Sequence, residues 1–380
     1  MCSQAKLELG DLQRKMLVKP RLKEALANIR SAVKFAPERA EYHYLLGEMN
    51  ADLAGVGNAT RESYYYRQAV DAYWSALTVD PDHSDAFFTL LWFQLYRADW
   101  RYGHEMGARV AEFVLKDLAP PPPGATNRNP SIRPLQAFLL LDADLQREVM
   151  RSFAHDVVET TGRTFISSPI PTTPAAAALS IAAARRGWAS EAGSALEPAH
   201  QRRLKVGYVS SDLGNHPLGH DFGHFFEYHD VEQFEVYAFN TRSRPDPTHW
   251  RSKIVDHLRD HWIDLSSLSD EEAARVISSL QLDVLINLNG YTPGSRNAIF
   301  AYRPAPVQVM WKGWAGSIGA EYVPFLISDK ISSPPEQADQ YTETLLYTPY
   351  SYFLNDYRQT HDRLLEIVSP VVCLLSDLQV

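Results

Sequence analysis

The chain has 380 residues, of which 45% are hydrophobic and 22% charged, with 37 basic and 46 acidic side chains. This apolar content can bury a core, which excludes a mainly disordered chain, and the length suggests two or three domains. The net charge of −9 disfavours non-specific binding to nucleic acid or to an anionic membrane, so neither is expected as a partner.

Cysteine usage and the lack of targeting signals predict a soluble cytoplasmic protein. Cys2 and Cys373 lie at opposite ends of the chain and give neither a disulfide framework nor a thiolate metal site. Residues 1–15 lack the continuous apolar stretch of a signal peptide. The longest weakly polar run, residues 175–184, is far shorter than the ~20 residues that cross a bilayer.

An internal repeat marks the N-terminal part. A small residue, a second small residue seven positions later and a proline five positions after that occur twice: Ala25, Ala32 and Pro37, then Ala69, Ala76 and Pro81. Each set predicts two helices joined by a turn, because proline ends a helix and small residues let helices approach closely. Residues 1–118 are therefore predicted to be an α-solenoid that resembles tetratricopeptide repeats.

The repeat is longer than a tetratricopeptide unit. The two prolines are 44 residues apart, against ~34 for such a unit. We assign the excess to a turn-rich insertion over Gly55 to Thr60, which lengthens a loop without disturbing the helices. A further helical stretch, Trp92 to Lys116, is predicted to continue the array with its aromatic residues packed between helices.

Residues 119–202 are predicted to be a proline-rich linker with intervening helices. The run Pro120 to Gly124 is incompatible with a helix and predicts a stiff, extended spacer. Helices are expected over Pro134 to Phe153 and over an alanine-rich segment that ends near Ala195.

From residue 203 the apolar pattern changes to short runs separated by turns and amphipathic stretches. The predicted strands are Leu204–Val209, Phe234–Phe239, Trp262–Leu265, Val284–Leu288, Val307–Trp311, Phe325–Ser328 and Leu345–Tyr347. The predicted helices are His220–Tyr228, His249–Asp260 and Asp270–Leu280. This alternation predicts a Rossmann-like α/β lobe over residues 203–356, whose functional site lies beyond the carboxyl ends of the strands.

The segment after the first strand, Ser210 to His220, concentrates polar side chains before a helix. It contains no G-x-G-x-x-G, so no dinucleotide is inferred. His216 is the foremost candidate, since an imidazole can take a proton from a hydroxyl. By itself, such a loop histidine more often caps a backbone carbonyl. His220 and His224 have the four-residue spacing of a metal pair, but packing or exposure is the commoner role for such a pair.

Two further polar loops follow later strands. Residues 287–294 place glycines on both sides of a polar cluster, as in a tight turn that approaches a ligand or in an ordinary connection between strand and helix. The segment Gly313 to Ala320 contains three glycines after another strand. All three loops are expected at the same edge of the sheet.

Four ordered blocks resemble the O-linked N-acetylglucosamine transferases. They are Lys205–Asp212, Gly214–Pro217, Asn287–Thr292 and Arg303–Pro306 with Gln308 and Trp311. Tetratricopeptide-like repeats before these blocks are similar to the order in bacterial members of that family. Trp314 and Ala315 depart from the family, which often has Tyr-Pro there.

The resemblance implies an inverting glycosyltransferase of the two-lobed GT-B architecture. It would move N-acetylglucosamine from UDP-GlcNAc to Ser or Thr hydroxyls of proteins, with no metal or other cofactor. Residues 203–356 would be the N-terminal lobe, with His216 as the catalytic residue. The substrate-binding positions that it implies are Asn215, Pro217, Asn289, Tyr291 and Thr292.

In this family the second lobe holds most of the diphosphate and uridine, and the chain is expected to stop before that lobe. Residues 357–380 do not continue the family pattern and could begin a further strand or the second lobe. Two other functions stay open. The helical repeats offer a groove to peptides, so the protein could be a non-catalytic scaffold, or it could be a related transferase with another donor, such as one that carries fucose.

Overall fold

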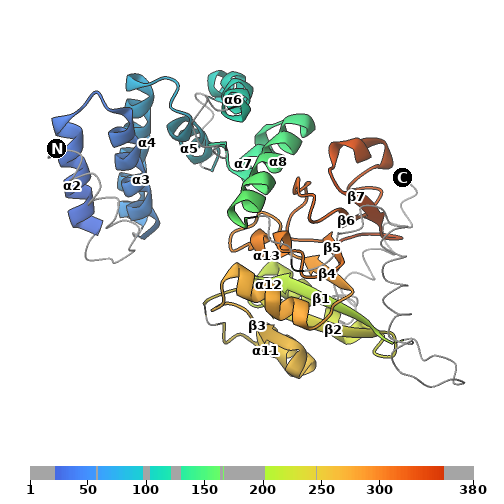
Figure 1. The fold of residues 1–380 in the computed structure, drawn as a ribbon. Helices are drawn as coiled ribbons and strands as arrows, with labels where there is room; N and C mark the ends of the chain where they lie inside the picture. The colour runs from blue at the N-terminus through green and yellow to red at the C-terminus, as the bar shows by residue number, and fades with distance from the viewer. Residues whose placement is uncertain are drawn as a thin grey trace, which may run out of the picture. The chain divides into compact units, whose positions relative to one another are not determined.

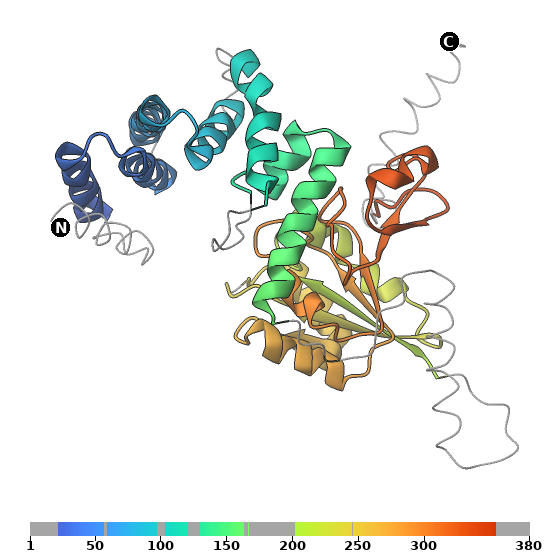
Figure 2. The same cartoon turned by 45° about the horizontal axis from the view of Figure 1, so that its top comes forward.

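The computed structural model describes residues 22–56, 59–96, 103–120, 130–162, 166, 202–244 and 246–354 (Figures 1 and 2). The chain forms two compact units, residues 1–149 and residues 150–380. The finer division after residues 118 and 202 stays a prediction. No helix in the described part of the chain is long and apolar enough to cross a membrane.

The first unit is helical, as predicted. Its helices are α2 (Leu22–Phe35), α3 (Ala40–Val56), α4 (Ala59–Val79), α5 (Ser84–Tyr96), α6 (Gly103–Leu118), α7 (Pro134–Leu140) and the start of α8 (Ala143–Thr160). The prolines of the repeat lie in the turns between α2 and α3 and between α4 and α5. The four repeated alanines, Ala25, Ala32, Ala69 and Ala76, have no exposed surface, so each helix pair packs through its small residues.

Three helical predictions differ from the structure in detail. The predicted insertion at residues 55–60 is mostly helix, because α3 continues to Val56 and α4 begins at Ala59, so the extra length lengthens the helices and not a loop. The stretch Trp92–Lys116 is divided between α5 and α6. The single helix predicted over Pro134–Phe153 is two helices, since Asp142 ends the first and caps α8 by accepting the Leu145 N–H at 3.0 Å.

The alanine-rich helix, the residues after Pro120 in the proline run, and the tail from residue 355 lie outside the described residues.

The second unit contains a seven-stranded parallel sheet in the order β3-β2-β1-β4-β5-β6-β7. The strands are β1 (Leu204–Ser210), β2 (Phe234–Asn240), β3 (Trp262–Asp264), β4 (Val284–Asn287), β5 (Val307–Met310), β6 (Phe325–Ser328) and β7 (Thr344–Tyr347). Every predicted strand is present, with ends that differ by at most one residue. The doubly wound parallel sheet predicted from strand-helix alternation is confirmed.

Helices and short 3-10 turns connect the strands. They are α10 (Pro217–Phe222), η2 (Phe225–Tyr228), α11 (His249–Leu258), η3 (Arg259–His261), α12 (Asp270–Ser279), α13 (Asn297–Ala301) and η4 (Pro335–Gln340). The helix predicted over His220–Tyr228 starts earlier and stops at Gly223, because His216 and Pro217 provide an N-terminal cap and first turn. The other two predicted helices are confirmed as α11 and α12.

Alternating residues of the strands fill the core on both faces of the sheet. Val206 and Tyr208 of β1 belong to a hydrophobic cluster with Phe222 of α10 and Ile254 of α11. Gly207, between them, faces the other way, where a Cβ would lie 2.6 Å from the Leu282 side chain. A strand buried on both faces has no solvent side, which explains why β1 carries no charged side chain after Lys205.

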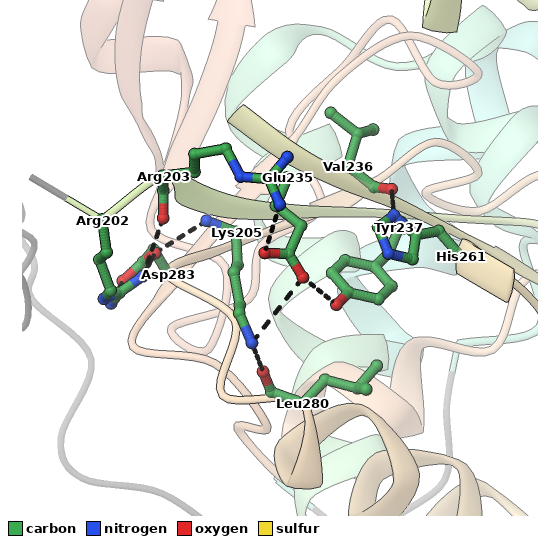
Figure 3. Close-up of polar contacts among 9 residues, drawn as sticks. All are labelled: Arg202, Arg203, Lys205, Glu235, Val236, Tyr237, His261, Leu280 and Asp283. Carbon is green, nitrogen blue, oxygen red and sulfur yellow. Dashed lines mark hydrogen bonds and ion pairs between the residues drawn. The ribbon is translucent and has the colours of Figure 1, made fainter. Parts of the chain in front are cut away.

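Charged residues join the amino ends of β1, β2 and β4 (Figure 3). Arg202 donates to both carboxylate oxygens of Asp283, at 2.5 and 2.6 Å, and Asp283 also accepts the Lys205 N–H at 2.9 Å. Lys205 donates to the Leu280 carbonyl at 3.1 Å, and Arg203 pairs with Glu235. These contacts hold the starts of the three strands together, at the edge opposite the predicted site.

Candidate functional site

The site lies where the strand order changes direction. The chain runs outward from β1 to β2 and β3 on one side and from β4 to β7 on the other (Figure 1). In open parallel sheets, functional sites lie beyond the carboxyl ends of the strands at the point where the strand order reverses. The three polar loops predicted from the sequence follow β1, β4 and β5, which are neighbours in the sheet.

Asn289 joins the first two loops. The side-chain oxygen Oδ1 of Asn289 accepts the Ser211 N–H at 2.9 Å. Its side-chain nitrogen Nδ2 donates to Ser211 Oγ at 3.1 Å and to Asp212 Oδ2 at 2.8 Å. The same nitrogen lies 3.1 Å from Thr292 Oγ1. Because these contacts use the amide's hydrogen-bonding groups, Asn289 ties the loop after β4 to the loop after β1 and orients Asp212 and Thr292.

A second pair of asparagines shapes the turn after β4. Asn287 Oδ1 accepts the N–H groups of Asn289 and Gly290, while its amide donates to Asn297 at 2.9 Å. Asn297 in turn donates to the Gly290 carbonyl at 3.0 Å. Gly290 has a φ of +56°, and a Cβ there would overlap Trp314. The glycine is required both for this backbone conformation and for the close approach of Trp314.

His216 is the N-cap of α10, and its Nδ1 accepts the Leu218 N–H at 3.2 Å. A loop histidine of this kind was expected to cap a backbone carbonyl, and that expectation is wrong here, because His216 accepts from a backbone N–H. A neutral imidazole that accepts at Nδ1 carries its proton on Nε2. In this conformation Nε2 of His216 is therefore a hydrogen-bond donor.

Asp246 holds the loop that carries His216. It accepts the Asn215 N–H at 2.7 Å and the Thr248 N–H at 3.1 Å. Burial raises the pKa of Asp246, but hydrogen bonds from Thr248 and Asn215 outweigh that effect and bring the pKa to about 2. A Cβ on Gly214 would overlap the Asp246 carboxylate, so the loop can close on this aspartate only with glycine at position 214.

A cleft of about 300 Å³ opens beside His216. Its lining comes from α10 and the loop before it, from the loop after β5 and from the chain after β7: His216, Pro217, Leu218, Asp221, Lys312, Gly313, Trp314, Ala315, Tyr352 and Phe353. The cleft therefore brings together three segments that are distant in the sequence, at the edge of the sheet predicted to carry the site.

Lys312 and Asp221 form a buried ion pair in the wall of this cleft. Nζ of Lys312 lies 2.6 Å from Asp221 Oδ2, and the two side chains are 3% and 11% exposed. Burial lowers the pKa of Lys312, and the hydrogen bond to Asp221 opposes that change. Neither residue was predicted from the sequence. Lys312 stands between Trp311 and Gly313, and Asp221 between His220 and Phe222, and neither setting marks a site residue.

The predicted substrate-binding residues have different positions. Pro217 lines the cleft with His216. Asn215 is exposed, with its Oδ1 3.1 Å from His220 Nε2. Thr292 Oγ1 donates to the Asn289 carbonyl at 3.0 Å. Tyr291 points inward, because its hydroxyl lies 2.8 Å from the Ile318 carbonyl and 3.2 Å from that of Met150, and burial raises its pKa.

His220 and His224 have separate partners. The His220 ring packs against Trp250 in a tilted arrangement, with ring centroids 4.5 Å apart and an angle of 34° between the planes. His224 contacts Glu227 at 3.1 Å and Lys253 Nζ at 2.9 Å. The described residues contain no group of three or more His, Cys, Asp or Glu side chains arranged to hold a metal ion.

A larger cavity of about 930 Å³ lies elsewhere in the second unit. Arg151 and His155 of α8, Arg303, Tyr322 and residues at the starts of β6 and β7 line it. None of the residues predicted to bind substrate contributes to it, and it lies at the amino ends of its strands. The smaller cleft at the carboxyl ends is therefore the candidate site.

Comparisons with known proteins identify the region that carries the cleft. Residues 192–372 match the model of glycosyl transferase family 41. A probable UDP-N-acetylglucosamine–peptide N-acetylglucosaminyltransferase, SEC of Arabidopsis thaliana, is 44% identical over 165 residues, which are 43% of this chain and 17% of that protein. The UDP-N-acetylglucosamine–peptide N-acetylglucosaminyltransferase of Caenorhabditis elegans is 42% identical over 159 residues, 42% of this chain and 14% of that protein.

A solved structure shares the fold over most of the chain. A mutant O-GlcNAc transferase of Thermobaculum terrenum aligns with a TM-score of 0.50 and 21% identity, over 93% of this chain and 59% of that chain. The chain thus spans less than a fifth of the length of the two sequence relatives and about three fifths of the structural one.

Proposed function

Because residues 192–372 form a domain of glycosyl transferase family 41, we propose that the protein transfers N-acetylglucosamine from UDP-GlcNAc to Ser or Thr hydroxyls of proteins. The observation that carries this proposal is the cleft beside His216, which opens at the carboxyl ends of the central strands within the family domain. The names of the relatives supply the donor and the peptide acceptor.

The proposed reaction is a single displacement at the anomeric carbon. The acceptor oxygen forms a bond to this carbon while the bond from carbon to the diphosphate oxygen breaks, with inversion. The electron pair leaves with UDP, and the hydroxyl proton passes to a base or to water. The protein must therefore hold the hydroxyl opposite the leaving group and meet the negative charge that develops on the diphosphate.

The cap on α10 restricts what His216 can do. With Nδ1 bound to the Leu218 N–H, the imidazole donates from Nε2, and can hold an oxygen atom of either substrate. To act as a general base at Nε2, the neutral imidazole must carry its proton on Nδ1 instead. A protonated Nδ1 cannot accept the Leu218 N–H, so this tautomer breaks the hydrogen bond that caps α10. We propose His216 as the residue that meets the reacting hydroxyl.

The remaining predicted residues support that geometry in the proposal. Asn289 and Thr292 hold the loop after β4 against Ser211 and Asp212, and Asn215 and Pro217 flank His216. The helical repeats are proposed to bind the acceptor chain. The transfer is proposed to need no metal, and activity that survives EDTA supports this part of the proposal.

We expect substitution of His216 to lower transfer without preventing folding. His216→Asn keeps an N-cap side chain but removes the imidazole, whereas His216→Ala removes both. Both should lower transfer from UDP-GlcNAc to a serine peptide by about 10²–10⁴-fold if the imidazole moves the proton. Only His216→Ala should also lose about 1 kcal/mol of stability. Transfer by the 380-residue chain is followed with labelled donor, and stability by urea unfolding.

The control is His220→Asn, which removes a neighbouring imidazole that does not line the cleft and should leave transfer near the unsubstituted rate. If the 380-residue chain neither binds UDP-GlcNAc by calorimetry nor transfers the sugar, the proposed activity is wrong for this chain. If both His216 variants still transfer the sugar at the unsubstituted rate, the proposed role of His216 is wrong, but the proposed activity stands.

A further inference from the structure

Lys312 is a cation in the wall of the cleft to which the proposed reaction assigns no role. Lys312 lies two residues after the end of β5 and has a φ of +56°, a left-handed conformation that is costly for a residue with a side chain. Gly313 follows with a φ of +63°, and a Cβ there would overlap the Leu288 carbonyl. This backbone turns the lysine from the end of the sheet into the cleft beside His216.

The ammonium group has hydrogen-bonding capacity beyond its ion pair. It has three N–H donors, and within the described part of the chain the carboxylate of Asp221 accepts from it at 2.6 Å. The ring of Phe353 covers it on another side, with its centroid 3.2 Å from Nζ. Phe353 is 54% exposed, so few packing contacts oppose rotation of this ring away from Lys312.

Stability alone is a weak reason for such a pair. Removing two charges from water costs about as much as their attraction returns, and apolar residues of similar volume often stabilise a protein as well. A buried cation does have a use in a cleft where negative charge develops, since its attraction to an oxyanion is stronger there than in water.

We propose that Lys312 binds an anionic oxygen of the sugar-nucleotide donor, in the place that the Phe353 ring occupies in this structure. The inference rests on the proposed function for the identity of the ligand. Asp221 keeps Lys312 oriented toward the cleft, and its negative charge offsets part of the positive charge that a ligand meets there. The anionic oxygen belongs to the diphosphate if the donor is UDP-GlcNAc, or to a carboxylate on the sugar if the donor is a different sugar nucleotide, and measurement distinguishes the two sources.

Substitution of Lys312 should weaken binding of the anionic ligand, whereas substitution of Asp221 or of Phe353 should tighten it. Inorganic pyrophosphate, UDP and UDP-glucuronate are titrated into the 380-residue chain by calorimetry at low ionic strength, where screening is weak. Lys312→Met should weaken binding by roughly 10–100-fold, through loss of a charge-assisted hydrogen bond. Asp221→Asn should tighten it, because a competing negative charge is removed, and Phe353→Ala should tighten it a few-fold, because the ring no longer covers Nζ.

The ligand that responds identifies the oxygen. If Lys312 meets the diphosphate, Lys312→Met weakens all three ligands by a similar factor. If it meets a sugar carboxylate, only UDP-glucuronate is weakened.

A misfolded variant is excluded by the double substitution Lys312→Met with Asp221→Leu, which replaces the pair by apolar groups. It should unfold at a urea concentration near that of the unsubstituted chain and still bind pyrophosphate or UDP-glucuronate as weakly as Lys312→Met. Unchanged binding of all three ligands by Lys312→Met overturns the proposal, as does equal weakening by Lys312→Met and Asp221→Asn, the sign of a purely structural pair.

These outcomes do not depend on sugar transfer. Lys312-dependent binding without transfer to any peptide supports this inference while the proposed activity fails. If the chain transfers the sugar but Lys312→Met does not change ligand binding, the proposed activity is supported and the inference about Lys312 is wrong.

Discussion

The polar residues at the carboxyl ends of the central strands differ in how much of their hydrogen-bonding capacity the protein itself uses. The side-chain amide of Asn289 forms hydrogen bonds with Ser211, Asp212 and Thr292. The Tyr291 hydroxyl lies near two backbone carbonyl groups. Both residues therefore shape the site from within. His216 keeps Nε2 for a ligand because only Nδ1 is engaged in the described contacts.

Glu343 provides a test of buried charge at the scale of one residue. It is 5% exposed, and one of its carboxylate oxygens accepts the Ile318 N–H at 2.8 Å. Within the described part of the chain its Oε2 is buried without a hydrogen-bond partner. Burial raises the pKa of Glu343, against the hydrogen bond from Ile318.

We predict that Glu343→Gln stabilises the protein near pH 7 and does not near pH 4. Because the folded-state pKa is raised, the folded protein binds the proton more tightly than the unfolded chain. Stability is then full below the unfolded pKa of about 4.3 and decreases as pH rises through the folded pKa. Gln has no charge to bury, so the variant escapes this loss. Urea unfolding at the two pH values measures the difference.

The matched control is Glu336→Gln, at an exposed position of η4, which should change stability equally little at both pH values. A Glu343→Gln variant that is less stable at pH 7 than the unsubstituted chain contradicts the assignment of a buried charge.

At the scale of elements, helix ends depend on single capping groups. The pattern over residues 134–153 is continuous in its apolar spacing, but the Asp142 carboxylate caps a new helix at Ala143. In the same way, His216 and Pro217 start α10 three residues earlier than its apolar pattern indicates. Periodicity predicts that a helix exists, whereas competition between caps decides where it begins and ends.

The repeated alanines give a prediction for the helix pairs. Ala32 of α2 and Ala76 of α4 occupy equivalent positions and are fully buried. We predict that Ala32→Leu and Ala76→Leu each destabilise the protein by about 1–3 kcal/mol, because the larger side chain overpacks the contact between helices. Urea unfolding followed by circular dichroism measures the loss.

Thr78→Leu on the exposed face of α4 serves as the control and should stay within about 0.5 kcal/mol. If both alanine substitutions are as mild as this control, the helices do not approach through these positions and the interpretation of the repeat is wrong.

At the scale of the molecule, the two ends of the parallel sheet have different tasks. The amino ends of β1, β2 and β4 carry ion pairs that satisfy one another (Figure 3). The carboxyl ends carry the cleft with His216 and Lys312. Changes at the first end should therefore affect stability, and changes at the second should affect binding.

Asp283→Asn tests this division. Asp283 is 1% exposed and holds Arg202 and the start of β1, so we predict a loss of about 2 kcal/mol from weakened charge-assisted hydrogen bonds. Binding of pyrophosphate should be unchanged under conditions in which the variant is folded. Urea unfolding and calorimetry on the same preparation measure both effects.

The exposed pair of Arg275 and Glu271 on α12 provides the comparison, because Glu271→Gln should cost less than about 1 kcal/mol. If Asp283→Asn also weakens pyrophosphate binding in the folded protein, the two ends of the sheet are not independent.

The helical repeats, all seven strands, the parallel sheet and the edge of the sheet that carries the cleft could be predicted from the sequence. These features follow from local patterns, because apolar period, proline position and polar strand ends are properties of neighbouring residues. Four short blocks between residues 203 and 353 already resemble the O-linked N-acetylglucosamine transferases, and residues 192–372 match the model of glycosyl transferase family 41. His216 was singled out before its surroundings were known.

Only the tertiary structure decided which polar residues face the cleft. Lys312 and Asp221 are 91 positions apart, and Phe353 reaches the lysine from beyond β7, so no local pattern could indicate that they meet. The structure likewise turned Tyr291 inward and made Nδ1 of His216 a cap. The physical reason is that the partner of a polar group is decided by packing between distant segments, whereas the elements that carry these groups are decided by the residues next to them.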